Sequence, residues 1–203
     1  MGRIAGLTSS AVLPVGRVLA APPAMPDDLF LIGPTKGYTP AVGTLVSMLD
    51  CMRFFVVSNV TGLSQTELDW QLDDKSNSIG AMLLHLAATE RYYQLNTFDE
   101  VAWGDWSEEI KAKWDVPMAL GEEARKQIKG HSVHYYLEQL EAVRKVTKIE
   151  LARRDDDWLA KTTTFFAQKS TTNYAKWFHV AEHESNHNGQ IKLIKRRLPA
   201  VAE

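Results

Sequence analysis

Helical periodicity is the feature that most constrains the fold of this chain. Over four long stretches, apolar residues recur at steps of three and four, the spacing that places them on one face of an α-helix. These stretches cover residues 39–60, 78–98, 132–151 and 172–198. Little of the remaining sequence alternates as a β-strand does, although the threonine-rich residues 160–172 are expected to form a short extended loop. The sequence therefore predicts an all-α protein, with a four-helix bundle as its architecture.

Residue types that start helices mark several element boundaries. Thr39-Pro40 suits an N-cap followed by the first helical position. Residues 64–70 open with the capping-box pattern Ser-x-x-Glu, which predicts a short helix after the first long one. Residues 99–130 show no sustained periodicity, so we expect an irregular link that crosses the domain or covers a site.

Residues 1–38 differ in composition from the rest of the chain. Six of the eight prolines fall within the first forty positions, and no helical period survives there. We expect a proline-rich arm at 1–38 and one helical domain at 39–199. The alternative for residues 1–20 is a signal segment, because Arg3 precedes an apolar stretch that ends near small residues. The arm predicts a cytoplasmic protein, whereas the signal segment predicts an exported one.

Composition narrows the classes of partner. The formal net charge of −2 over 203 residues disfavours a nucleic-acid binder, which would carry a basic face. No run of eighteen apolar residues exists, so no transmembrane helix is expected. The single cysteine, Cys51, excludes internal disulfides and cysteine-rich metal sites. A small-molecule partner is the remaining expectation.

Two histidines occupy core positions of the last helical stretch. Its seam reads Trp177, Val180, His183, His187, Ile191, Ile194 and Leu198. Residues four apart lie one above the other on a helix, and buried imidazoles are costly unless something binds them. We therefore predict that His183 and His187 share a ligand, while His179 lies at the margin of the core.

A further histidine, His85, is the one strongly polar residue in the apolar run 79–88. Such a lone histidine is more often a hydrogen-bonded core residue than a ligand. If the second and last long helices face one another, however, His85 joins His183 and His187 around one metal ion. Three imidazoles with an open fourth position are typical of catalytic zinc. The set suits Zn or Ni, with Fe or Cu as alternatives, and disfavours Mg or Ca.

The segment 183–187 also matches H-E-x-x-H, the zinc-protease signature, with Glu184 as general base. The extended form of that signature needs His at 193, which is Leu193, and Gly at 190, which is Gln190. The protease interpretation is therefore disfavoured. Glu184 and Glu90 remain weak catalytic candidates, although Glu184 is one residue from a seam position and is expected to point away from the core.

Two segments together carry a resemblance to a known family. The sequence SIGAMLLHLAATERYY at 78–93, followed by H-x-x-x-H-x-x-x-H-N-G-Q-I at 179–191, resembles the DinB/YfiT-like metalloenzymes. The resemblance spans about residues 39–198. It implies a four-helix bundle in up-down-down-up order, with a long crossover between helices two and three, for which residues 99–130 are suited.

The resemblance also implies a metal triad of His85, His183 and His187. Family members of known activity are often bacterial transferases or isomerases that use low-molecular-weight thiols such as bacillithiol or mycothiol. A homodimer is plausible for this family. In this chain Asn188 stands where an Arg is common, so any contact that depends on that cation is in doubt.

Three functional hypotheses follow. In the first, a divalent ion activates a low-molecular-weight thiol for transfer to a small electrophile. In the second, a metal hydroxide hydrolyses its substrate with Glu184 or Glu90 assisting. In the third, the histidines bind metal without catalysis, or only hydrogen-bond. The sequence does not name the substrate.

Overall fold

The computed structural model describes residues 21–199, and the described chain is mostly helical. In chain order the elements are α1 (Pro40–Val60), α2 (Gln65–Asp69), α3 (Ile79–Thr97), α4 (Glu108–Ala119), α5 (Gly121–Gln127), α6 (Val133–Leu151), α7 (Asp156–Ala160), β1 (Thr162–Thr164), the 3₁₀ turn η1 (Phe166–Gln168), β2 (Ser170–Thr172) and α8 (Asn173–Lys195). The only sheet among these residues pairs β1 with β2. The predicted all-α class is confirmed.

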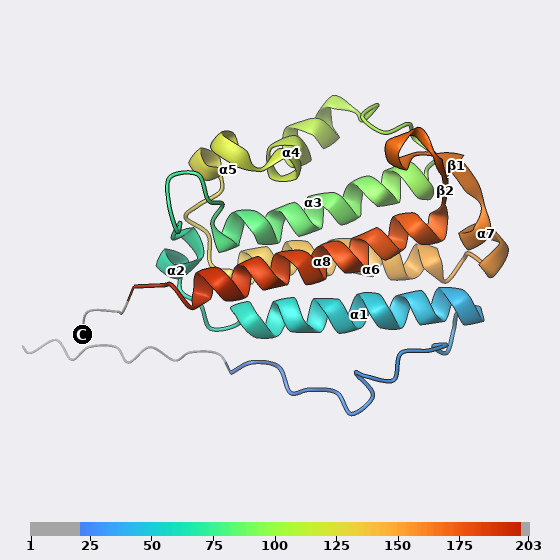
Figure 1. The fold of residues 1–203 in the computed structure, drawn as a ribbon, viewed down its shortest axis with the longest axis horizontal. Coiled ribbons are helices and arrows are strands. Elements are labelled where there is room, and N and C mark those ends of the chain that lie inside the picture. Colours follow the sequence, from blue (N-terminus) through green and yellow to red (C-terminus); the bar gives the residue numbers. More distant parts are fainter. Residues whose placement is uncertain (1–20, 200–203) are drawn as a thin grey trace, which may run out of the picture.

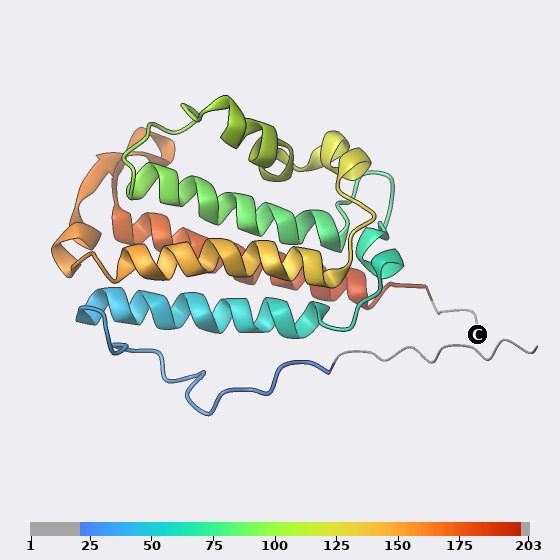
Figure 2. The same cartoon turned by 180° about the vertical axis from the view of Figure 1, so that it is seen from behind.

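The four long helices α1, α3, α6 and α8 lie side by side in both ribbon views (Figure 1, Figure 2). α1 packs mainly against α8, while α3 packs against α4, α6 and α8. Because α3 has neighbours on several sides, nearly all of its residues are buried, as the apolar run at residues 79–88 requires. This central position brings His85 to face α8.

Side-chain caps fix the starts of three of these helices. Ser78, Ser132 and Thr172 each accept a hydrogen bond from the backbone N–H three residues on. α1 begins at Pro40, as predicted, but the side chain of Thr39 does not cap it. Instead Asp156 of α7 accepts hydrogen bonds from the N–H groups of Ala41 and Val42, at 3.0 and 3.1 Å. One end of α1 is thus tied to the segment before α8.

The crossover at residues 99–130 differs from the irregular link that the sequence predicts. It contains two short helices, α4 and α5, which lie over α3 (Figure 1). Few of their side chains are buried, so they lack the long apolar stripe that reveals a core helix. Pro117 within α4 further obscures the helical pattern. α4 buries Trp114 and Pro117 against the core, and the backbone near its end reaches His85.

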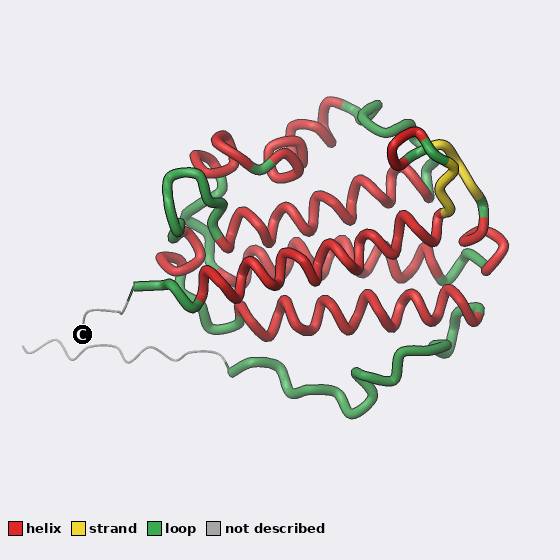
Figure 3. Tube along the Cα trace, viewed as in Figure 1, coloured by secondary structure: helices red, strands yellow, loops and turns green. Residues whose placement is uncertain are grey.

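The threonine-rich segment forms a short hairpin beside the start of α8 (Figure 3). β1 and β2 pair antiparallel, with Thr163 opposite Thr171. The turn between them carries Phe165 and Phe166, whose rings are 4.9 Å apart. The hairpin therefore delivers two aromatic side chains to one end of the helices.

The described part of the N-terminal arm, residues 21–38, runs along α1 without forming a helix or strand (Figure 1). Gly33 N–H donates to Ser47 Oγ at 3.1 Å, and Phe30 contacts Phe55. The segment 1–20, for which a signal sequence is the alternative, lies outside the described residues. By length and composition, α1 is the one described helix that could cross a membrane; ordinary core helices pass the same test, and α1 packs against α6, α7 and α8.

Candidate metal centre

The fold brings together the three histidines that the sequence singles out. His85 lies on α3, and His183 and His187 lie one turn apart on α8. The Nε2 atoms of His85 and His183 are 2.8 Å apart, and one ring nitrogen from each residue lies within 4.8 Å of the others. We call His85, His183 and His187 the histidine triad. Its members come from segments about a hundred residues apart, so the triad depends on the packing of α3 against α8.

A backbone carbonyl at the end of α4 fixes the tautomer of His85. His85 Nδ1 lies 3.0 Å from the carbonyl oxygen of Pro117. That carbonyl belongs to the last turn of α4, where carbonyl groups have no partner within the helix. A carbonyl can only accept, so His85 Nδ1 carries a proton and donates it. In the neutral ring, Nε2 is then the bare nitrogen, and it faces His183.

Burial keeps the triad neutral. It lowers the pKa of His85, where the Pro117 carbonyl acts in the opposite direction. Burial, together with the charge that neighbouring imidazoles would carry, lowers the pKa of His183 to about 3 and that of His187 to about 4. All three rings are therefore neutral near pH 7, each with one protonated and one bare nitrogen. Neutral imidazoles are the form that binds a metal ion.

These residues fit a divalent transition-metal ion. The donors are three neutral nitrogens, the set that suits Zn, Ni, Fe or Cu. Nitrogens bound to one tetrahedral zinc lie about 3 to 3.5 Å apart, so small ring rotations suffice from the separations present. Within the described chain, the buried Nδ1 of His187 has no hydrogen-bond partner. A bound ion would rationalise two imidazole nitrogens that approach to 2.8 Å in a largely apolar interior.

A large cavity opens beside the triad, and we call it the site cavity. It has a volume of about 860 Å³. His183 and His179 reach its wall, whereas the more deeply buried His85 and His187 do not. The other lining residues are Thr89, Tyr93, Asn96, Thr97, Glu100, Val101, Ala102, Trp103, Met118, Lys161, Thr163, Thr164, Phe165, Phe166, Ala167, Gln168, Asn173 and Lys176. The α3 end, the crossover and the hairpin therefore build the wall together.

His179 lies at the margin of the core, as its offset from the seam predicts. Its ring is half-buried and contacts those of His183 and Phe166. Its Nδ1 lies 3.0 Å from the Tyr93 hydroxyl, and burial raises the pKa of that phenol while lowering the pKa of His179. The pair is uncharged near neutral pH and stands next to the triad in the cavity wall.

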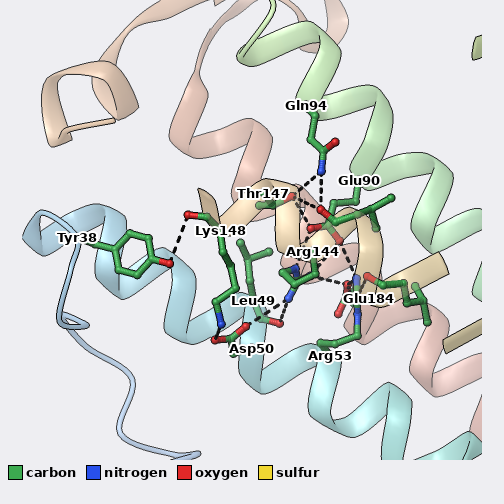
Figure 4. A network of polar contacts seen from close by, with 12 residues as sticks. Tyr38, Leu49, Asp50, Arg53, Glu90, Gln94, Arg144, Thr147, Lys148 and Glu184 are labelled. Carbon is green, nitrogen blue, oxygen red and sulfur yellow. Dashed lines mark hydrogen bonds and ion pairs between the residues drawn. The ribbon is translucent and has the colours of Figure 1, made fainter. Parts of the chain in front are cut away.

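The two weak catalytic candidates, Glu90 and Glu184, lie in a different part of the interior (Figure 4). Each is paired with arginines: Arg53 contacts both carboxylates, and so does Arg144. We call these four residues the charge cluster. Neither glutamate lines the site cavity. The expectation that Glu184 points away from the core is wrong, because the side chain is buried at the centre of the four long helices.

Sequence reasoning missed the arginines of the charge cluster and the aromatic wall of the cavity. Arg53 and Arg144 occupy core positions of α1 and α6, between apolar neighbours at helical spacing. An arginine at an otherwise apolar core position was the sequence signal that could have indicated a buried ion pair. Tyr93, Trp103 and Phe165 come from three separate segments, and no single sequence pattern joins them.

A family model described as Mycothiol-S-transferase matches residues 44–199. The matched range covers α3, α6 and α8 completely, all of α1 except its first four residues, and every member of the histidine triad. No curated protein matches the chain.

Proposed function

The chain belongs to the mycothiol-S-transferase family, a DinB/YfiT-like family, and on that premise we propose that it transfers a low-molecular-weight thiol to a small electrophile. The single observation that carries the proposal is the histidine triad beside a cavity of about 860 Å³. Mycothiol is the thiol that the family description favours, and bacillithiol is the comparison. His85, His183 and His187 would hold the ion, for which we propose Zn or Ni.

A divalent ion held by neutral ligands keeps its full charge and lowers the pKa of a thiol that binds it. The chain's own residues account for the rest. The carbonyl of Pro117 keeps the bare nitrogen of His85 toward the site, and burial keeps the other two imidazoles neutral. The aromatic part of the cavity wall would offer apolar surface to the body of the electrophile.

In the transfer, a carbon–sulfur bond forms and the bond from that carbon to its leaving group breaks. The thiol proton must leave, and the leaving group departs with the bonding electron pair, as a halide ion does without gaining a proton. We assign the relay of the thiol proton to His179, which stands beside His183 and is held by the Tyr93 hydroxyl at 3.0 Å. For an addition reaction, the same proton would go to the electrophile.

We also propose the finer architecture of an up-down-down-up four-helix bundle. The course of the chain supports it: in Figure 1, α3 and α6 run in one direction, while α1 and α8 run in the opposite one. Along the chain, the crossover α4–α5 connects α3 to α6, and this is the connection that must be long in that order. A homodimer remains a proposal. We further propose a cytoplasmic location, since thiols are kept reduced there.

The test begins with metal analysis of the purified protein, followed by removal of metal and reconstitution with Zn or Ni. Conjugation of mycothiol and of bacillithiol to 1-chloro-2,4-dinitrobenzene and to monobromobimane would be followed by mass spectrometry. We expect metal-dependent conjugation, lost in His183→Ala. His134→Ala is the matched control, because His134 is exposed and pairs with Glu138 of the same helix rather than with a residue of the site.

Two results would contradict the proposal. Metal-dependent ester or amide hydrolysis without any thiol would favour the hydrolase alternative. Failure of the protein to bind metal, with an unchanged melting temperature in His183→Ala, would favour a non-catalytic role for the histidines.

A further inference from the structure

Lys176 of α8 is a buried cation that has no acidic partner among residues 21–199. Its exposed fraction is only 2%. Nζ donates a hydrogen bond to Asn96 Oδ1 at 2.9 Å and lies 4.5 Å from the centre of the Phe165 ring. No carboxylate of the described chain forms an ion pair with it. An ammonium has three N–H donors, so these two contacts leave one donor without an assigned partner.

This situation differs from that of the other buried charges in the described residues. In the charge cluster, each arginine forms ion pairs with both glutamates. Burial alone lowers the pKa of Lys176, and no anion counteracts it. Burying an unpaired charge is unfavourable for folding, and an apolar side chain would fill the same space without that cost. A role in binding would explain why a cation stands there.

The surroundings of Lys176 favour an anion. It lines the site cavity and lies in the first turns of α8, where the helix dipole is positive. The cavity wall contains one other lysine, Lys161, and one carboxylate, Glu100, and these two already pair with each other at 2.7 Å. The cavity therefore holds an unbalanced positive charge at the end near Lys176.

Lys176 also shares a face of α8 with His183 and His187. It precedes His183 by seven positions, which is about two helical turns, or about 10 Å along the axis. Between them the wall is aromatic: the rings of Trp103 and Phe165 are 5.2 Å apart, and Tyr93 contacts both. A ligand that spans this distance would place one end at Lys176 and the other at the triad.

We propose that Lys176 binds an anionic group, a carboxylate or a phosphate, of the electrophilic co-substrate. The apolar body of that molecule would lie against Trp103 and Phe165, with its reacting carbon toward His183. The inference rests on the proposed function for the identity of the ligand as a co-substrate. The binding of an anion at Lys176 is nevertheless measurable without any turnover.

The experiment measures equilibrium binding to the full-length protein by isothermal titration calorimetry, with and without zinc. The probes are 3-phenylpropanoate, its uncharged amide, and phenyl phosphate. The wild-type protein should bind one or both anions more tightly than the amide, and the tighter anion identifies the group. Lys176→Met should weaken anion binding about tenfold to a hundredfold, the effect of losing one charged hydrogen bond. Binding of the amide should stay unchanged.

Lys161→Met is the matched control. It removes a cation from the same cavity, but this cation already pairs with the carboxylate of Glu100. We expect it to weaken anion binding much less. Lys176→Arg keeps the charge and should retain most of the binding. Circular dichroism and melting temperature establish that each variant is folded.

The inference is overturned if the amide binds as tightly as the anions, or if neither anion binds. Equal losses in Lys176→Met and Lys161→Met would also overturn it, since the effect would then come from general charge. If anions bind through Lys176 but no thiol is ever transferred, the proposed function fails while this site stands.

Discussion

At the scale of single residues, the lowered pKa values of two buried histidines determine how the stability of the protein depends on pH. His183 and His187 have their pKa lowered to about 3 and 4, while an imidazole in the unfolded chain titrates near 6.5. Between pH 6.5 and about 4 the unfolded chain therefore binds protons that the folded chain does not. The stability of the metal-free protein falls as the pH is lowered through that window. The same shift keeps both imidazoles neutral at mildly acidic pH.

Zinc affinity should consequently change little between pH 7.5 and 5.5 and fall steeply only below about pH 5. A site made of ordinary histidines would begin to lose affinity near pH 6.5, because protons compete for each nitrogen. Competition with a chelating dye at each pH measures this. A decline of tenfold or more between pH 7 and 6 would contradict the expected burial of the triad.

The triad itself was predictable at this scale. Histidines at seam positions of the last helix, and one in an apolar run of another, are visible in the sequence. The burial of Lys176 was not predictable, because a lysine near the start of a helix is ordinarily exposed. Only the structure shows that Asn96 and Phe165 of the hairpin contact its ammonium group. Its environment comes from segments that no local pattern connects.

At the scale of elements, α3 and α6 come unusually close where Gly80 meets Tyr136. A Cβ built on Gly80 would lie 2.6 Å from the Tyr136 hydroxyl oxygen and 2.7 Å from the ring carbon that bears it. Tyr136 is fully buried, so its ring has little room to move. Gly189 in α8 is the opposite case, since nothing lies within 4 Å of such a Cβ.

Gly80→Ala should therefore destabilise the protein by about 1–3 kcal/mol, because the overpacking exceeds the gain in helix propensity. Gly189→Ala should stabilise it by about 0.5–1 kcal/mol, because only the propensity changes. Urea unfolding of both variants measures the two effects. Equal stabilisation by both substitutions would mean that α3 and α6 are further apart than the structure has them.

Element boundaries followed the sequence where a long apolar stripe met a capping residue. α1, α3, α6 and α8 begin where Pro40, Ser78, Ser132 and Thr172 indicate. α4 and α5 were not predicted, since most of their side chains face water and Pro117 interrupts one of them. A helix that buries only two side chains leaves too weak a period to recognise.

At the scale of the whole molecule, the charge cluster takes one residue from each long helix. Arg53 comes from α1, Glu90 from α3, Arg144 from α6 and Glu184 from α8 (Figure 4). The arginines also donate to backbone carbonyls, Arg53 to Leu140 and Arg144 to Leu49. Every one of the four helices is thus linked to the others through a single buried group of side chains.

Arg144→Met should cost about 3–5 kcal/mol of stability, because it leaves buried carboxylates with too little compensating charge. Lys126→Met is the control, since the Lys126–Glu122 pair is exposed and its loss should change little. Chemical denaturation gives both values. An effect of Arg144→Met no larger than that of the control would mean that the cluster is dispensable for folding.

Acid should act on the same cluster. Burial works to raise the pKa of Glu90, but the charges of Arg144 and Arg53 outweigh it and hold the pKa at about 2. The carboxylate therefore contributes its full stability above about pH 4.5, its unfolded value, and loses it as the pH falls toward 2. Glu90→Gln should show a smaller loss of melting temperature across that range than the wild-type protein.

The hydrogen bond from His85 to the Pro117 carbonyl joins the crossover to the triad, and the two should therefore respond to each other. Thermodynamic reciprocity requires that whatever stabilises one stabilises the other by the same free energy. Metal binding should slow amide hydrogen exchange in α4, although no residue of α4 is a ligand. Conversely, a substitution that loosens α4, such as Trp114→Ala at its buried face, should weaken metal binding from a distance. The segment that the sequence least reveals would then act as a regulator of how tightly the ion is held.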